Sequence, residues 1–261
     1  MKNHEEFAFY KKNGFYIHEQ PIIPSDLIDR AVSRIPNIIN EEYDMGIPPS
    51  RRWNLGDKKK IQKVDQVHRC DSAFFDLVTS PQLGEAVAAI CGANAIQIWD
   101  TQLFIKPAGG GSQGNIGWHT DAVNWYWWSG DVFTVWLPLV DVDTTIGTLA
   151  YLSGSHEWDV DMEIKDAYSQ NLAETENKIR EQMDLRSFDA SYVEIPKGAF
   201  SVHHKSILHG SAENRSDKAR VCVAINVRSE HSKPLPEKDD MGFLKHLGNP
   251  VFSPVIYQNS N

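Results

Sequence analysis

Gly117-Trp118-His119-Thr120-Asp121 is the stretch around which the chain is organised, and its partner, Leu208-His209-Gly210-Ser211, comes much later. Successive side chains of an extended strand alternate faces, so His119 and Asp121 project on the same side, about 7 Å apart along the backbone. An imidazole and a carboxylate placed in this way can bind one metal ion. His209 would then complete a set of two histidines and one carboxylate, which holds Fe(II) on one face and leaves other positions open.

The His-x-Asp motif alone is a weak signal, because it arises by chance in many proteins. The residues after the second histidine strengthen it, since Ser211 and Arg220 follow His209 within a β-rich run. Two further histidines, His203 and His204, lie close by but precede a Lys-Ser-Ile-Leu segment. A hydrogen-bonded core imidazole, or a metal other than iron, stays open as another interpretation of the motif.

The composition is that of an ordinary globular chain. Its 261 residues are 41% hydrophobic and 23% charged, and all-β barrels commonly reach this size as one domain. The net charge of −9 argues against a nucleic-acid partner, which would require a concentrated basic surface. It is compatible with a small anionic ligand, because a few local arginines can outweigh distant acidic groups.

The cysteines and the N-terminus indicate the compartment. Cys70, Cys91 and Cys222 are dispersed and form no Cys-x-x-Cys pair, so we expect buried free thiols rather than disulfides or a zinc site. The N-terminus carries acidic residues and no apolar segment of the signal-peptide type. No apolar run approaches the roughly 20 residues that cross a bilayer. We therefore expect a cytoplasmic protein without a membrane partner.

The hydrophobic pattern predicts helices near the N-terminus and strands in the centre. Ser25 is the expected N-cap of one helix, and Pro36 predicts a bend or an early end of it. Residues 40–69 are polar and are expected to be irregular. The expected helices cover 4–12, 25–39, 71–79 and 81–91. The expected strands cover 15–17, 96–106, 132–139, 192–195, 199–202 and 219–227.

Three segments interrupt this pattern. The glycine-rich stretch 109–114 lacks the Gly-Lys-Ser/Thr ending of a phosphate-binding loop, so we expect a flexible rim of a pocket instead. Residues 157–190 carry alternating charges that predict a surface helix, and we interpret this insertion as a lid or rim over the site. The tail, about 229–261, contains Pro234, Pro236 and Pro250 and is expected to wrap the surface.

Two groups of residues are candidates for substrate contact. If the segment after the metal motif is extended, Trp125 and Trp127 share one face and Trp128 takes the other. Each indole could equally be core packing, although the position favours at least one that faces substrate. There it could hold an apolar body or a quaternary ammonium. Arg51 and Arg52 lie in a polar segment and could hold an anionic end.

The chain resembles the phytanoyl-CoA dioxygenase family of Fe(II)/2-oxoglutarate-dependent oxygenases over roughly residues 7–228. Besides the two metal motifs, the matching elements follow the family's order: Asn13-Gly14-Phe15, Gln102, Lys106, residues 133–137, 147–149 and 154–156. The resemblance implies a mainly β fold with flanking helices, a double-stranded β-helix or cupin-like jelly roll. It implies one domain over 1–261, with N-terminal helices to about 92 and the β-helix core at about 95–228.

The resemblance also implies roles for individual residues. His119, Asp121 and His209 would bind Fe(II), and Arg220 would pair with the distal carboxylate of 2-oxoglutarate, helped by Ser211. Other family positions around the cosubstrate and the cavity match Thr134, Trp136, Gln102 and Lys106. Two alternatives remain, because Arg220 could form a surface salt bridge and Lys106 could be an ordinary cation at the pocket rim.

The implied activity is that of a dioxygenase that uses Fe(II), 2-oxoglutarate and O₂ to hydroxylate, or otherwise oxidise, a small-molecule metabolite with release of succinate and CO₂. Related halogenases replace the metal-binding carboxylate by Gly or Ala, so Asp121 favours hydroxylation. The alternative is a non-catalytic, cupin-like protein that binds a metal or a small molecule. Such a protein would not need a cosubstrate anchor like Arg220. Family members act on very different small molecules, so the resemblance names no substrate.

Overall fold

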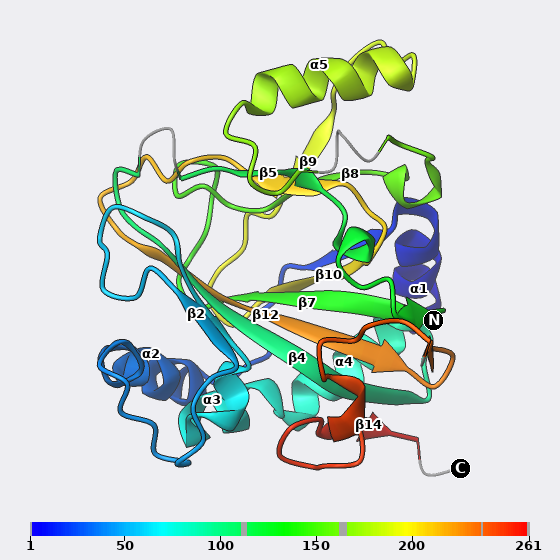
Figure 1. Cartoon of the computed structure of the whole chain (residues 1–261). Coiled ribbons are helices and arrows are strands. Elements are labelled where there is room, and N and C mark those ends of the chain that lie inside the picture. Colours follow the sequence, from blue (N-terminus) through cyan, green and yellow to red (C-terminus); the bar gives the residue numbers. More distant parts are fainter. Residues whose placement is uncertain (1, 111–113, 162–165, 236, 260–261) are drawn as a thin grey trace.

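The computed structural model contains two facing layers of strands, and helices pack against the outer face of the larger layer (Figure 1). It describes residues 2–110, 114–161, 166–235 and 237–259. The larger sheet has the strand order β1-β10-β7-β12-β4-β3-β2, and β14 also pairs with β4. Its strands are β1 (Phe15–His18), β2 (Arg51–Trp53), β3 (Gln62–Asp65), β4 (Ala95–Lys106), β7 (Val132–Pro138), β10 (Phe200–His204), β12 (Arg220–Ser229) and β14 (Val255–Gln258).

The smaller sheet has the order β5-β11-β8-β9, and a separate pair joins β13 to β6. These strands are β5 (Ile116–His119), β6 (Trp128–Ser129), β8 (Ala150–Leu152), β9 (Ala190–Tyr192), β11 (His209–Ser211) and β13 (Lys233–Pro234). The α-helices are α1 (Lys2–Asn13), α2 (Ser25–Ile39), α3 (Ser72–Val78), α4 (Pro81–Cys91) and α5 (Leu172–Gln182). The 3₁₀ turns include η1 (Val67–Arg69), η3 (Asp121–Val123), η4 (Ser155–Glu157) and η6 (Leu244–His246).

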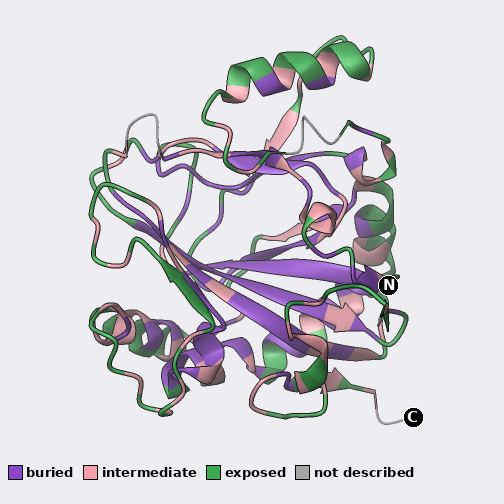
Figure 2. Ribbon diagram, viewed as in Figure 1, coloured by how far each residue is buried: buried purple, intermediate pink, exposed green. Residues whose placement is uncertain are grey.

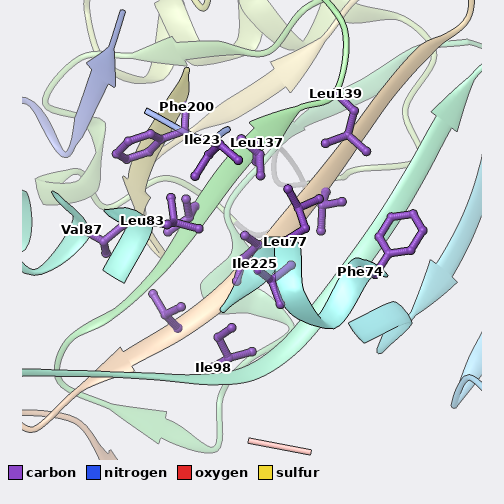
Figure 3. Close-up of a cluster of buried hydrophobic side chains, with 14 of the residues drawn as sticks. Ile23, Phe74, Leu77, Leu83, Val87, Ile98, Leu137, Leu139, Phe200 and Ile225 are labelled. Atoms are coloured by element: carbon purple, nitrogen blue, oxygen red, sulfur yellow. The ribbon is translucent and has the colours of Figure 1, made fainter. Parts of the chain in front are cut away.

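The outer face of the larger sheet holds the main core. Leu77 of α3 and Leu83 of α4 are fully buried in one cluster with Leu137 and Ile225 of the sheet (Figure 3). Burial of each such side chain contributes about 1.5–3 kcal/mol. The central strands β4, β7, β10 and β12 are buried along most of their length (Figure 2), because helices cover one face of the sheet and the smaller sheet lies over the other.

The inner face of the larger sheet carries polar and aromatic side chains. In β4 the residues Leu103 and Ile105 pack in the helical core, so Gln102 and Lys106 face the smaller sheet. The β4–β12 register passes from Asp100 opposite Asn226 to Ile98 opposite Val227. Trp99 is therefore the extra residue of a β-bulge, which turns it toward the same side as Asp100.

Several predicted elements are confirmed. The first helix, the helices at 71–79 and 81–91, and the surface helix of the insertion correspond to α1, α3, α4 and α5. The mainly β jelly roll with flanking helices is also confirmed, because two antiparallel sheets face each other across the inner space. The three cysteines are buried and free, as expected. Among the residues described, no helix combines the length and apolar character needed to cross a membrane.

The predicted helix over 25–39 is confirmed as α2, but three other local predictions were wrong. Ser25 is the first residue of α2 rather than its cap, which is Pro24 without a side-chain hydrogen bond, and the helix runs through Pro36. The supposedly irregular stretch 40–69 contributes β2 and β3 to the larger sheet. The segment after the metal motif is not extended, since η3 and a turn precede β6. The tail, predicted to wrap the surface, also adds β14 to the larger sheet, although Pro236 itself lies outside the described residues.

Candidate metal centre

His119 and His209 lie directly opposite each other on the paired strands β5 and β11. The Nδ1 atom of His119 is 2.8 Å from the Gly117 carbonyl oxygen, and that of His209 is 3.0 Å from the Ile207 carbonyl oxygen. A carbonyl oxygen only accepts, so both Nδ1 atoms carry the proton. Each Nε2 atom is left with a free lone pair, which is the arrangement of a metal-binding histidine held by its backbone.

Asp121 brings the third donor atom. Its Oδ1 atom is 3.9 Å from His119 Nε2 and 3.8 Å from His209 Nε2, and one donor atom from each residue lies within 4.8 Å of the others. The second oxygen, Oδ2, accepts a hydrogen bond from Thr134 Oγ1 at 2.8 Å. One carboxylate oxygen is therefore available to a metal while the other is fixed by the larger sheet.

His203 of β10 supports the same carboxylate from the side. Its Nε2 atom lies 3.3 Å from Asp121 Oδ2, and its Nδ1 atom lies 3.0 Å from the Tyr151 hydroxyl. Tyr151 in turn is 2.7 Å from Ser201 Oγ. With Nε2 protonated, His203 donates to Asp121 and accepts from Tyr151. His204 faces the other way, where its Nδ1 accepts from the Ser206 N–H.

The protonation states suit a divalent cation. Burial lowers the pKa of His119 and of His209 to about 4, so both imidazoles are neutral at neutral pH. Burial acts to raise the pKa of Asp121, but the facing imidazoles, His209 foremost, outweigh it and lower the pKa below its ordinary value. Neutral imidazoles and an ionised carboxylate are the forms that bind metal. The donor set fits Fe(II) in the two-histidine, one-carboxylate arrangement.

Two buried cations lie side by side on the inner face of the larger sheet. Lys106 and Arg220 are register partners between β4 and β12 and are 0% and 2% exposed. Lys106 Nζ donates to Ser211 Oγ at 2.7 Å. Arg220 donates to the Gly147 carbonyl oxygen, and its guanidinium lies 5.6 Å from the centre of the Trp136 ring. Arg220 Nε has no hydrogen-bond partner among the residues described.

No carboxylate in the described part of the chain forms an ion pair with Lys106 or Arg220. Burial, and then the neighbouring Arg220, lower the pKa of Lys106 well below its ordinary value. Two cations that share a buried site are unfavourable unless an anion lies between them. A carboxylate of a small ligand would supply that anion, so these residues fit the distal end of 2-oxoglutarate.

The remaining predicted site residues fall into two groups. Thr134 contacts the metal-binding carboxylate, and Gln102 donates from Nε2 to Asp100 Oδ2 at 3.2 Å. Arg51 places a guanidinium nitrogen 3.1 Å from Met241 Sδ. Arg52 projects from the opposite face of β2 and pairs with Glu41 at 2.8 Å, so the structure does not bring it to the metal.

The tryptophans after the metal motif pack together. Trp125, Trp127 and Trp128 are all nine-tenths or more buried and share a cluster with Trp99 and Val132. We call the four indoles the Trp99 cluster. The predicted division of these tryptophans between two faces was wrong, because the turn before β6 directs all three to one side. Their contact with substrate stays a prediction, as do the cosubstrate roles of the residues above.

Sequence reasoning missed part of this site. The sequence pattern does not place His203 at the metal and does not indicate Asp100, Tyr151 or Asn226. For His203 and Asn226 a signal exists, since both fall at alternate positions of the buried strands β10 and β12 that carry polar residues. Of the glycine-rich rim, residues 111–113 lie outside the described residues, as do residues 162–165 of the insertion.

A jelly roll that gathers two histidines and a carboxylate between its sheets, beside two buried cations, has the architecture of a cupin-like metalloprotein. The chain belongs to the phytanoyl-CoA dioxygenase (PhyH) family, whose pattern matches residues 10–222. The predicted family is thereby confirmed.

Individual relatives are distant in sequence. A probable alpha-ketoglutarate-dependent hypophosphite dioxygenase of Stutzerimonas stutzeri is 23% identical over 177 residues, which are 68% of this chain and 60% of that protein. The alpha-ketoglutarate-dependent carbocyclase SnoK has a TM-score of 0.69 at 18% identity, covering 93% of this chain and 90% of SnoK. The epimerase SnoN, solved with Fe³⁺ and alpha-ketoglutarate, has a TM-score of 0.69 at 17% identity, covering 92% and 91%.

Proposed function

We propose that this protein is an Fe(II)- and 2-oxoglutarate-dependent dioxygenase that hydroxylates, or otherwise oxidises, a small-molecule metabolite with release of succinate and CO₂. The observation that carries the proposal is the buried pair of Lys106 and Arg220 on the same inner face as the metal centre. A protein that only binds metal has no need for two buried cations. Membership of the PhyH family and the relatives' dependence on alpha-ketoglutarate support the same conclusion.

Different residues would bind the metal and the cosubstrate. His119, Asp121 and His209 would hold iron, and the remaining positions on the metal would serve 2-oxoglutarate and O₂. Iron with its cosubstrate supplies the oxidising chemistry when bound. Thr134 and His203 fix the Asp121 carboxylate. Arg220, Lys106 and Ser211 hold the distal carboxylate of 2-oxoglutarate, and the Trp136 ring shields that contact from water.

Anaerobic titration tests this proposal directly. We expect the Fe(II) protein to develop the charge-transfer absorption of a bound 2-oxo acid when 2-oxoglutarate is added, with saturation at one equivalent. On admission of O₂, a panel of candidate metabolites should then be screened for succinate release. Absence of the absorption band would refute the cosubstrate role. A protein that binds Fe(II) but neither binds nor consumes 2-oxoglutarate would be the non-catalytic, cupin-like binder.

A further inference from the structure

The inner face of the larger sheet carries a buried carboxyl group that the proposed function leaves unused. Asp100 of β4 is 2% exposed. Its Oδ2 atom accepts from Gln102 Nε2 at 3.2 Å and from Asn226 Nδ2 at 3.1 Å. Its Oδ1 atom is also buried and has no hydrogen-bond partner in the described part of the chain. A buried carboxyl oxygen without a partner is unfavourable, so this oxygen is available to a polar group of a ligand.

Asp100 lies close to the metal centre. Asp100, Asn226 and Thr134 are register partners across the adjacent strands β4, β12 and β7. Neighbouring strands are about 4.8 Å apart, which puts the backbones of Asp100 and Thr134 about 10 Å from each other. Thr134 holds the metal-binding carboxylate of Asp121 at 2.8 Å. The distance from Asp100 to the metal centre is therefore that spanned by one small molecule.

The residue that precedes Asp100 belongs to a cluster of aromatic rings. The bulge turns Trp99 toward the same side, and its ring is 5.0 Å from Trp125, 6.1 Å from Trp127 and 5.3 Å from Phe243, measured between centroids. The buried Nε1 atoms of Trp99, Trp127 and Trp128 have no acceptor among the described residues. A carboxylate beside indole rings is the combination that recognises an organic cation.

The charges on the inner face are separated along β4. Lys106 and Asp100 face the same side at positions six residues apart, which corresponds to about 20 Å of strand. The Lys106 end, with Arg220, attracts a carboxylate and repels a cation. The Asp100 end does the reverse when Asp100 is ionised, because nearby Asp65, the register partner of Gln102, is already paired with Lys63. Cosubstrate and substrate would thus approach the metal from opposite ends.

We propose that Asp100 binds the ammonium group of a small primary amine substrate through its free Oδ1 atom, while the Trp99 cluster surrounds the apolar part. This inference rests on the proposed function and names the substrate class of the same site. The N–H of an ammonium supplies the missing donor. Burial, and then Asp65, raise the pKa of Asp100 to about 8, so the empty site holds a protonated carboxyl group at neutral pH. A bound ammonium would stabilise the ionised carboxylate, and the proton would leave to solvent on binding.

Paired probes test the inference in the anaerobic protein loaded with Fe(II) and 2-oxoglutarate. Butylamine, cyclohexylamine and benzylamine, all protonated at neutral pH, would each be compared with the alcohol of the same carbon skeleton. Binding is followed by calorimetry and by the fluorescence of the buried indoles. We expect at least one amine to bind at least tenfold more tightly than its alcohol. No preference for the amine in any pair would overturn the inference without recourse to a variant.

The variants Asp100→Asn and Asp65→Asn provide the matched comparison. The first keeps the size of the side chain and loses the charge, so the preference for the amine should fall about 10- to 100-fold. Asp65 is already paired with Lys63 at 3.2 Å, so Asp65→Asn should retain the preference. If Asp100→Asn retains the preference for the amine, or if only Asp65→Asn loses it, Asp100 is not the residue that binds the ammonium group.

Binding of Fe(II) and of 2-oxoglutarate is measured first in each protein. Asp100 makes no direct contact with the metal ligands or with the Lys106–Arg220 pair and is linked to Asp121 through Asn226 and Thr134. Both constants should therefore be near those of the parent. If the parent itself fails to bind them, the proposed function is wrong. If they bind normally and the amine preference is absent, only the present inference is wrong.

Discussion

The candidate metal centre is specified, at the scale of single residues, by hydrogen bonds that leave only certain atoms free. The backbone carbonyl groups of Gly117 and Ile207 accept hydrogen bonds from the Nδ1 atoms of His119 and His209, and Thr134 donates to one oxygen of Asp121. What remains is two Nε2 lone pairs and one carboxylate oxygen, all pointing into the same space. The supporting contacts therefore determine the geometry as much as the ligands do.

Substitution of the ligands gives the first prediction. His119→Ala, Asp121→Ala and His209→Ala should each abolish iron-dependent turnover and retain the fold, as judged by circular dichroism. His203→Ala should keep all three ligands but loosen Asp121, which should weaken Fe(II) binding about 10- to 100-fold. His204→Ala is the control, because this side chain faces away. A fully active His209→Ala protein, with His203→Ala or His204→Ala inactive, would identify a different ligand.

The second prediction concerns the cosubstrate anchor. Arg220→Lys keeps the charge but loses the planar fork that matches a carboxylate. Loss of a charge-assisted hydrogen bond costs about 1.5–3 kcal/mol, so affinity for 2-oxoglutarate should fall roughly 10- to 150-fold while Fe(II) binding is unchanged. Arg228→Lys, at the other end of β12, is the control. If Arg220→Lys and Arg220→Ala bind 2-oxoglutarate as tightly as the parent, Lys106 becomes the next candidate.

Sequence could predict the site residues that belong to short motifs, but not those whose position depends on how the strands pair. His-x-Asp and His-Gly-Ser are short motifs that can be recognised without knowledge of the strand register. Which of His203 and His204 faces the metal is different, because a shift of one residue in the pairing of β10 would exchange them. The inward position of Asp100 could not be predicted for a similar reason, since the bulge at Trp99 changes which residues of β4 face inward.

At the scale of elements, the insertion and the metal strand are joined. Gly117 of β5 donates its N–H to the Ala167 carbonyl oxygen at 3.0 Å, and Trp118 Nε1 donates to Glu176 of α5 at 3.1 Å. The chain that leads into α5 thus packs directly on the backbone of the strand that ends in His119. Whether this insertion acts as a lid stays a prediction.

Gly117→Ala is the third prediction. A Cβ atom there would lie 2.1 Å from the Asp166 carbonyl oxygen, which is backbone and cannot turn away. Either β5 or the insertion must then shift, and the carbonyl that orients His119 shifts with it. We expect Fe(II) affinity to fall about 10- to 100-fold, measured by metal titration. Gly248→Ala, where a Cβ would meet nothing within 4 Å, is the control and should leave Fe(II) affinity unchanged. If both variants bind Fe(II) equally well, packing of the insertion on β5 does not affect the metal site.

Limited proteolysis provides the fourth prediction. If the insertion closes over the site, cleavage between 157 and 190 should slow when Fe(II), 2-oxoglutarate and substrate are all present. The protein with Fe(II) alone is the comparison, because the three proposed metal ligands lie on β5, η3 and β11, outside the insertion. Cleavage at the same rate in all states would exclude a gating role.

Two of the elements that sequence reasoning missed, β2 and β14, share a physical property. β2 is exposed at every residue, so it lacks the alternation of apolar and polar positions that predicts a strand. β14 is short, and its first and last residues are also exposed. Both pair with longer strands, and this long-range pairing rather than a local pattern makes them strands. The long buried strands β4, β7 and β12 carry their own pattern and were predictable.

The stability of the whole molecule should report the ionisation of Asp100. Its folded pKa is about 8, whereas an unfolded aspartate ionises near 4, so the unfolded state releases this proton first as the pH rises. The carboxyl group therefore contributes stability below about pH 4, and this is lost progressively up to about pH 8. Asp100→Asn removes the effect.

The fifth prediction follows from this linkage. Between pH 5 and pH 7, the free energy of unfolding of the parent should decrease relative to that of Asp100→Asn by about 1.4 kcal/mol per pH unit. Urea denaturation across this range measures the difference. A difference that does not change with pH would show that Asp100 ionises normally in the folded protein.

The alternation of side chains along β4 and β12 has a consequence for how this protein can change. Odd positions such as Leu103 and Ile105 of β4 belong to the helical core, while Gln102 and Lys106 face the inner space between the sheets. Neighbouring residues of one strand are thus under separate selective pressures, one for packing in the core and the other for contacts in the inner space. New substrate preferences can be acquired by replacing every second residue, with the core left intact, so a library for directed evolution should vary only these inward positions.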